Sequence, residues 1–135
     1  MKRETKVISL ELAKQIDVEH KRLGIVVESE YWWNDSLNTT FYRTSWIGDK
    51  SEWHSTDPDE QSYIEENQYP AYDVAELGEM LPHRFYSLKS RLEYKWNGLG
   101  TYRDKDYFQV GDTEVEVRGK LYLWYIKEGG TKHGN

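Results

Sequence analysis

The side chains that most often carry catalysis lie in this chain without a recognisable catalytic pattern. The histidines are His20, His54, His83 and His133, and they form neither a pair one helical turn apart nor a His-Glu-x-x-His motif. No serine lies in a Gly-x-Ser-x-Gly elbow, and no P-loop or Gly-x-Gly-x-x-Gly motif is present. The sequence therefore predicts no catalytic residue, no metal site and no cofactor, and it predicts four mostly exposed histidines.

Glu76 and Glu79 are the carboxylate pair with the most suggestive spacing, because residues three apart share one face of a helix. Acid–base hydrolysis needs two carboxylates that converge across a cleft, whereas these two are expected side by side on a short exposed helix. Glu76 also has a structural explanation, since Asp73 and Glu76 have the spacing of a capping box. The pair does not favour an enzyme.

Aromatic residues are the more informative set, with 11 Tyr, 6 Trp and 3 Phe in the chain. Tyr31-Trp32-Trp33 and the segment from Tyr42 to Trp46 are expected on neighbouring strands, so Tyr31 and Trp33 share one face and Trp32 lies on the other. Either helices cover both faces of this hairpin, or part of it is an exposed aromatic surface. The candidate binding residues are Tyr31, Trp32, Trp33, Tyr42, Arg43, Trp46 and Trp53.

An exposed aromatic surface would suit two kinds of partner. Rings beside Arg43 can anchor a protein interface, or they can stack on a base or nucleotide. The run from Asp57 to Glu66 holds five carboxylates, which could mimic nucleic acid, although a solvated loop is the commoner explanation of such a run.

The elements expected in the first half are a helix, a hairpin and a loop. A helix of about four turns begins after the N-cap Ser9 and ends before Gly24. Strands follow over Ile25–Trp33 and Thr39–Ile47. The polar segment Asp49–Gln68 is interpreted as a long acidic surface loop.

The second half predicts a short helix, two strands and a final element. The capping box starts a helix over Asp73–Leu81, and strands over Ser90–Asn97 and Gly100–Val110 are joined by a glycine-rich turn at 97–100. Thr113–Glu128 fits a strand by alternation and a helix by its caps, and the caps favour a helix. The expected fold is a single α+β domain over residues 1–135. It has an antiparallel sheet of about four strands, with the N- and C-terminal helices packed on it and flexible ends at 1–6 and 131–135.

Composition narrows the functional classes. The net charge of −6, from 24 acidic and 18 basic residues, argues against direct nucleic-acid binding, which normally needs a basic face. No segment approaches the roughly 18 apolar residues needed to span a bilayer, and there is no cysteine. These observations predict a cytoplasmic protein without disulfides that acts away from membranes. The same observations are compatible with a homo-oligomer.

Four segments of the chain carry a resemblance: Ser9–Lys14, Arg22–Gly24 with Glu28–Trp33, Val74–Pro82, and Thr113–Glu114 with Leu121–Ile126. Together they resemble a group of small, functionally uncharacterised proteins of bacteriophages, prophages and other bacterial mobile elements. The string Ala-Glu-Leu-Gly-Glu-Met-Leu-Pro is the most specific part. The resemblance implies a cytoplasmic protein in a bacterial host and favours the C-terminal helix. It supplies no catalytic residues.

The functional prediction is a phage or mobile-element accessory protein that acts by stoichiometric binding to a host or phage protein. The alternative is sequestration of a nucleotide-like small molecule on the aromatic surface beside Arg43. An enzyme of unrecognised type is the third hypothesis.

Overall fold

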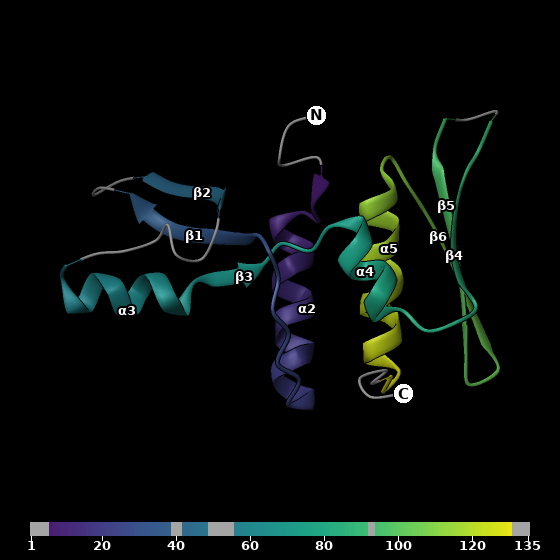
Figure 1. The fold of residues 1–135 in the computed structure, drawn as a ribbon, viewed down its shortest axis with the longest axis horizontal. Coiled ribbons are helices and arrows are strands. Elements are labelled where there is room, and N and C mark those ends of the chain that lie inside the picture. The colour runs from purple at the N-terminus through teal and green to yellow at the C-terminus, as the bar shows by residue number, and fades with distance from the viewer. Residues whose placement is uncertain (1–5, 39–41, 49–55, 92–93, 131–135) are drawn as a thin grey trace.

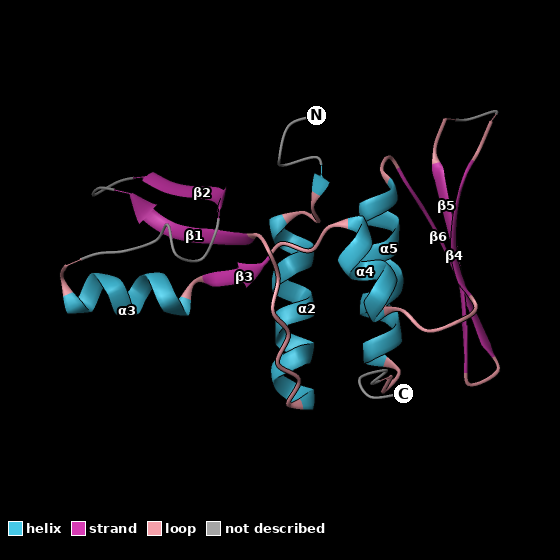
Figure 2. Ribbon diagram, viewed as in Figure 1, coloured by secondary structure: helices cyan, strands magenta, loops and turns pink. Residues whose placement is uncertain are grey.

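The computed structural model of the chain describes residues 6–38, 42–48, 56–91 and 94–130, and the side chains of 35–48 are outside this description. Helices and antiparallel strands alternate along these residues, so the α+β class is confirmed (Figure 2). The strands are divided between two three-stranded sheets, β2-β1-β3 and β4-β5-β6, where the sequence predicted one sheet of about four.

The first helix, α2, spans Leu10–Leu23 and confirms both predicted caps. The side chain of Ser9 accepts a hydrogen bond from the amide of Leu12 at 3.3 Å, and Gly24 adopts the left-handed conformation with φ 71°. One face of the helix is buried, through Leu12, Ala13, Ile16 and His20. The remaining face is charged, as expected for a helix that packs on one side only.

The predicted strand at Ile25–Trp33 is wrong over most of its length. β1 spans Trp32–Asn38, and the chain before it runs beside α2 without joining a sheet (Figure 1). The carboxylate of Glu76 accepts hydrogen bonds from the Ser29 hydroxyl at 3.1 Å and from the Glu30 amide at 3.0 Å. Polar groups of this segment are therefore satisfied by a side chain from another element, which β propensity cannot reveal.

β1 forms a hairpin with β2, which spans Tyr42–Gly48, and the pairing runs from Trp32 opposite Gly48 to Asn38 opposite Tyr42. A hairpin was predicted in this part of the chain, but its first strand was expected to end at Trp33. β3, Gln68–Pro70, pairs with the other edge of β1. The predicted loop at Asp49–Gln68 is corrected for its second half, which forms helix α3 over Pro58–Glu66, whereas residues 49–55 lie outside the described part. Proline suits the first position of a helix, where its missing amide proton costs nothing.

The second sheet consists of β4 (Phe85–Lys89), β5 (Trp96–Tyr102) and β6 (Lys105–Gly111). The predicted strands at Ser90–Asn97 and Gly100–Val110 are therefore misplaced. The glycine-rich segment expected as a turn between them lies inside β5. Glycine is needed at position 98 because a Cβ there would collide with Val117 and Leu121 of the C-terminal helix. The β5–β6 turn is at Arg103 and Asp104, both of which have positive φ.

Two further helices complete the core. α4 spans Val74–Met80 and starts with the predicted capping box, in which Asp73 and Glu76 each accept from the other's backbone amide. α5 spans Glu114–Lys127, so the helical interpretation of the C-terminal segment is confirmed, with Thr113 as its N-cap. α5 contacts α2, α4 and all three strands of the second sheet. It therefore forms the centre of the molecule.

Helices α2, α4 and α5 lie between the two sheets, whereas α3 lies beside β1 (Figure 1). α5 covers one face of β4-β5-β6, and α2 contacts both α5 and β3 of the first sheet. The fully buried side chains come mainly from these helices and the chain before α4, and include Ile16, Tyr72, Leu77, Val117 and Tyr122. No described element lies against the outer face of β4-β5-β6 (Figure 1).

Candidate functional site

The outer face of the second sheet carries a group of large exposed apolar side chains, which we call the apolar sheet face. Their exposed fractions range from 38% for Val110 to 70% for Leu88. Most large apolar side chains elsewhere in the described chain are buried or half-buried. The members of the apolar sheet face are Tyr86, Leu88, Leu99, Phe108 and Val110.

Strand register places these side chains next to one another. Tyr86 lies opposite Leu99, and Leu99 lies opposite Phe108, so these three form one row across the sheet. Asn97 lies between Leu88 and Val110 in the adjacent row. Directly opposed residues on antiparallel strands have Cβ atoms about 5 Å apart, so the two rows form one surface that is apolar except for Asn97 at the centre of the second row.

The opposite face of the same sheet explains why these residues point outward. Phe85, Trp96, Tyr102 and Tyr107 pack against the core, and Gly98 lets α5 approach the backbone closely. Successive residues of a strand point to opposite faces. Once α5 covers one face, the alternating apolar residues must therefore face solvent.

The sequence-predicted binding residues Tyr31, Trp32 and Trp33 are half-buried. The indole of Trp33 donates to the carbonyl of Ile8 at 2.9 Å, and its ring packs against the core. The indole of Trp32 donates to the carbonyl of Ser29 at 3.0 Å. Trp33 is therefore held by the core, which favours a structural role for this ring.

The side chains of the other predicted binding residues lie outside the described part of the structure. The backbones of Tyr42, Arg43 and Trp46 lie on β2, but their side chains are outside the description, as is the whole of Trp53. The register places Trp46 opposite Asn34 and Arg43 opposite Leu37. The nucleotide-stacking role predicted for Arg43 stays a prediction.

Tyr31 lines a cavity of about 680 Å³ between the start of α4 and the start of α5. Trp96 from β5 lines the same cavity, and both helix N-caps, Asp73 and Thr113, border it. The volume lies within the range of small-molecule sites. Of the predicted binding residues, Tyr31 lines this cavity.

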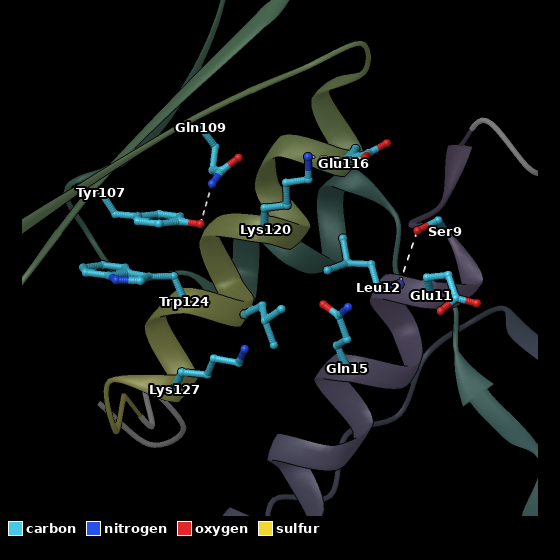
Figure 3. A pocket seen from close by; sticks show the side chains of 11 residues that line it. Ser9, Glu11, Leu12, Gln15, Tyr107, Gln109, Glu116, Lys120, Trp124 and Lys127 are labelled. Atoms are coloured by element: carbon cyan, nitrogen blue, oxygen red, sulfur yellow. Dashed lines mark hydrogen bonds and ion pairs between the residues drawn. The ribbon is translucent and has the colours of Figure 1, made fainter.

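A second cavity, of about 580 Å³, lies between α2, α5 and β6 (Figure 3). Tyr107 stacks on Trp124 with ring centroids 5.0 Å apart and planes 2° from parallel, and Gln109 donates to the Tyr107 hydroxyl. Lys120 forms an ion pair with Glu116 at 3.5 Å. The walls are mixed in charge, and no histidine lines them.

His20 corrects the prediction of mostly exposed histidines, since it is only 5% exposed. Its Nε2 is 2.6 Å from the Tyr122 hydroxyl, and its Nδ1 is 3.4 Å from the Tyr72 hydroxyl. His83 is exposed as predicted, whereas His54 and His133 lie outside the described residues. Burial raises the pKa of both Tyr72 and Tyr122 above the ordinary value of 10.0.

The cluster of His20, Tyr72 and Tyr122 joins α2, the chain before α4 and α5. A neutral imidazole has one donor and one acceptor, so it can satisfy two hydroxyl groups at once. None of these three residues lines a cavity described above. The cluster therefore satisfies buried polar groups within the core.

Within the described part of the chain, no group of three or more His, Cys, Asp or Glu side chains is placed to hold a metal ion. No helix among those residues is long and apolar enough to cross a membrane.

Sequence reasoning missed the apolar sheet face, although part of its signal is local. Tyr86 and Leu88, like Phe108 and Val110, alternate with residues of the inner face. Alternation shows that a strand has two faces, but it does not show which face α5 covers. With aromatic residues on both faces, the direction of burial had to come from the packing.

Comparisons with protein-family models, with curated proteins and with solved structures find no significant match to this chain.

Proposed function

We propose that this chain acts by stoichiometric binding to another protein, and that it binds through the apolar sheet face. The observation that carries the proposal is the continuous exposure of Tyr86, Leu88, Leu99, Phe108 and Val110 on one sheet face. Contiguous apolar surface of this kind is uncommon on monomeric proteins and is typical of interaction sites. The resemblance of the sequence to phage and mobile-element proteins favours a host or phage protein as the partner.

The shape and chemistry of the face fit this role. Large apolar side chains such as Phe108 and Tyr86 supply most of the binding energy when a partner desolvates them. They stand on a sheet that α5 supports from behind, so little conformational entropy is lost when the face is covered.

A capture experiment tests the proposal. Tagged protein and a Leu88→Asp, Phe108→Asp double variant are incubated with bacterial lysate, and the captured proteins are quantified by mass spectrometry. A partner of this face should be captured by the unmodified protein and lost at least tenfold with the double variant. Val26→Asp is the matched control, because Val26 is 89% exposed and lies outside the face.

The test compares the proteins captured by the unmodified protein with those captured by the double variant. Equal capture by the unmodified protein and the double variant would contradict binding through the apolar sheet face. Far-UV circular dichroism of each variant is needed beside the capture. Both substituted side chains are already exposed, so the fold is expected to be retained.

A small acidic molecule is the second candidate ligand, and the cavity between α2 and α5 favours it. Lys120 and Lys127 both line this cavity, and Trp124 adds an aromatic wall (Figure 3). A nucleotide-like ligand combines negative charge with a flat ring and would match these groups. Nucleotide released on denaturation of the purified protein would absorb near 260 nm, and Lys127→Ala should reduce the amount.

A further inference from the structure

The two edges of the apolar sheet face carry opposite charge. Arg84 precedes β4 and is exposed, and Arg91, which follows the strand, is exposed as well, whereas Lys89 shares a row with Trp96 of the inner face. On β6, the exposed acidic residue of the outward-facing rows is Asp106. One edge of the face is therefore basic and the other acidic.

The apolar rows lie between these charged edges. Arg84 is next to Thr101, since the Thr101 amide donates to the Arg84 carbonyl at 3.2 Å. Thr101 lies opposite Asp106, and its hydroxyl donates to the Asp106 carboxylate at 2.8 Å. Arg84 and Asp106 are thus at the two ends of the same cross-strand row, beside the row that holds Tyr86, Leu99 and Phe108.

This arrangement is self-complementary. A two-fold axis parallel to the strands, in the plane of contact, places β4 of one copy over β6 of the other. Tyr86 then faces Phe108, Leu88 faces Val110, and Leu99 faces its own copy at the centre. Arg84 of each copy comes opposite Asp106 of the other, so the dimer contains this pair twice.

We infer that a second copy of this chain covers the apolar sheet face in the purified protein, with β4 over β6 and Arg84 opposite Asp106. The inference rests on the proposed function, because it takes the same face as a protein-binding surface; a host or phage partner would bind this face in place of the second copy. Face-to-face packing of two sheets is a common way to bury apolar rows of this kind. Lys105 on β6 does not weaken the acidic edge, since its ammonium pairs with Glu128 at 3.2 Å.

Charge exchange between two variants tests this geometry. In Arg84→Asp, two copies would place the introduced carboxylate of one opposite the native Asp106 of the other. In Asp106→Arg, they would place the introduced guanidinium opposite the native Arg84. Each variant alone therefore repels itself at both positions. This repulsion should disappear when the two variants are mixed.

In the mixed dimer, one contact joins the introduced aspartate of the first variant to the introduced arginine of the second. The other contact joins the native Asp106 of the first variant to the native Arg84 of the second. Both contacts therefore unite opposite charges again, and the mixture should form a heterodimer.

Sedimentation equilibrium from about 5 to 500 μM protein measures the mass of each sample. The unmodified protein should approach twice the monomer mass at the highest concentrations. Each single variant should dissociate at least tenfold more readily, since opposed like charges destabilise an interface. An equimolar mixture of the two should recover the dimer, and Phe108→Asp should be monomeric throughout the range.

Three results would overturn the inference. The unmodified protein could be monomeric at every concentration, Phe108→Asp could dimerise like the unmodified protein, or the mixture of charge variants could fail to recover the dimer. The capture experiment distinguishes this failure from failure of the proposed function. A monomeric protein that still loses a lysate partner on Leu88→Asp, Phe108→Asp binds a different protein through the same face.

Discussion

The segment Tyr31–Trp33 and the apolar sheet face are both rich in large side chains, but they differ in what holds those side chains. Trp33 contacts the core and donates a hydrogen bond to Ile8. Phe108 is 60% exposed, and no hydrogen bond or described element fixes its outward face. The first region contributes to the stability of the monomer, whereas the second is available to another molecule.

This difference shows why an aromatic composition does not locate an interface. Aromatic rings bury a large area in a core as readily as in a complex. The four tryptophans whose side chains the structure describes, Trp32, Trp33, Trp96 and Trp124, are all half-buried. The most exposed large side chains on the apolar sheet face are Leu88 and Phe108, so exposure locates a candidate binding surface better than ring content does.

The largest expected effect is on the stability of the Trp33→Ala variant. Loss of a large ring that packs against the core should lower the free energy of unfolding by about 3 kcal/mol. Phe108→Ala should change it by less than about 0.5 kcal/mol, because that side chain is already largely in water. Urea denaturation at low protein concentration, where any dimer is dissociated, measures both. Equal losses in the two variants would remove the distinction between the regions.

A second contrast lies within one strand, between Gly98 and Leu99. A Cβ on Gly98 would collide with Val117 and Leu121, so Gly98→Ala should destabilise the protein by about 2 kcal/mol. Leu99→Ala acts on the other face of β5 and should leave monomer stability nearly unchanged. Thermal unfolding of the two variants compares them. A neutral Gly98→Ala would mean that α5 does not approach β5 as closely as described.

Gly98 also shows where prediction from sequence fails. Glycines at 98 and 100 are typical of a tight turn, and nothing local to the sequence shows that a helix close to β5 requires them. The helix ends were predicted well because their causes are local. Ser9, Gly24 and the Asp73 capping box act within four residues of the backbone groups that they satisfy.

The candidate site depends on packing between distant parts of the chain, which local sequence patterns do not show. The strands were expected in one sheet, so Phe108 and Val110 could not be assigned to an uncovered face. His20 was expected to be exposed, because its partners Tyr72 and Tyr122 are 52 and 102 residues away in the chain. Contacts at such separations come from packing, and local patterns do not report them.

Alkaline pH should destabilise the fold through the buried side chain of Tyr122. Burial raises the pKa of Tyr122 above 10.0, so above this pH the unfolded chain loses a proton that the folded protein keeps. Stability is unaffected by this group below pH 10 and falls above it, by about 1.4 kcal/mol per pH unit. Tyr122→Phe should therefore reduce the loss of stability between pH 9 and 11 by about 1.4 kcal/mol. Denaturant unfolding at each pH measures the difference.

The matched control for this experiment is Tyr86→Phe, which removes an exposed hydroxyl group from the apolar sheet face. Its free energy of unfolding at pH 7 should change by less than about 0.5 kcal/mol. Tyr122→Phe also removes the partner of His20 Nε2, so its stability at pH 7 should already be lower by about 1 kcal/mol. If Tyr122→Phe keeps the full alkaline loss, the hydroxyl of Tyr122 is not buried.

The smallest expected effect concerns the link between the Tyr31–Trp33 segment and the core. The Glu76 carboxylate accepts from the amides of Asp73 and Glu30 and from the Ser29 hydroxyl, so it joins the start of α4 to the chain before β1. Glu76→Ala should destabilise the protein by about 1 kcal/mol, as the loss of a helix cap does. Glu79→Ala, on the same helix but exposed, should cost less than about 0.5 kcal/mol.

Hydrogen exchange separates the two tasks of Glu76. Loss of the cap alone would raise exchange at the start of α4, whereas loss of the link would also raise it at Glu30, whose amide donates to this carboxylate at 3.0 Å. We expect both regions to exchange faster in Glu76→Ala, with no change on β4, β5 or β6. Faster exchange across the second sheet would mean that the aromatic segment and the apolar sheet face are not independent. The interaction tests at Phe108 would then have to be interpreted together with the stability of β1.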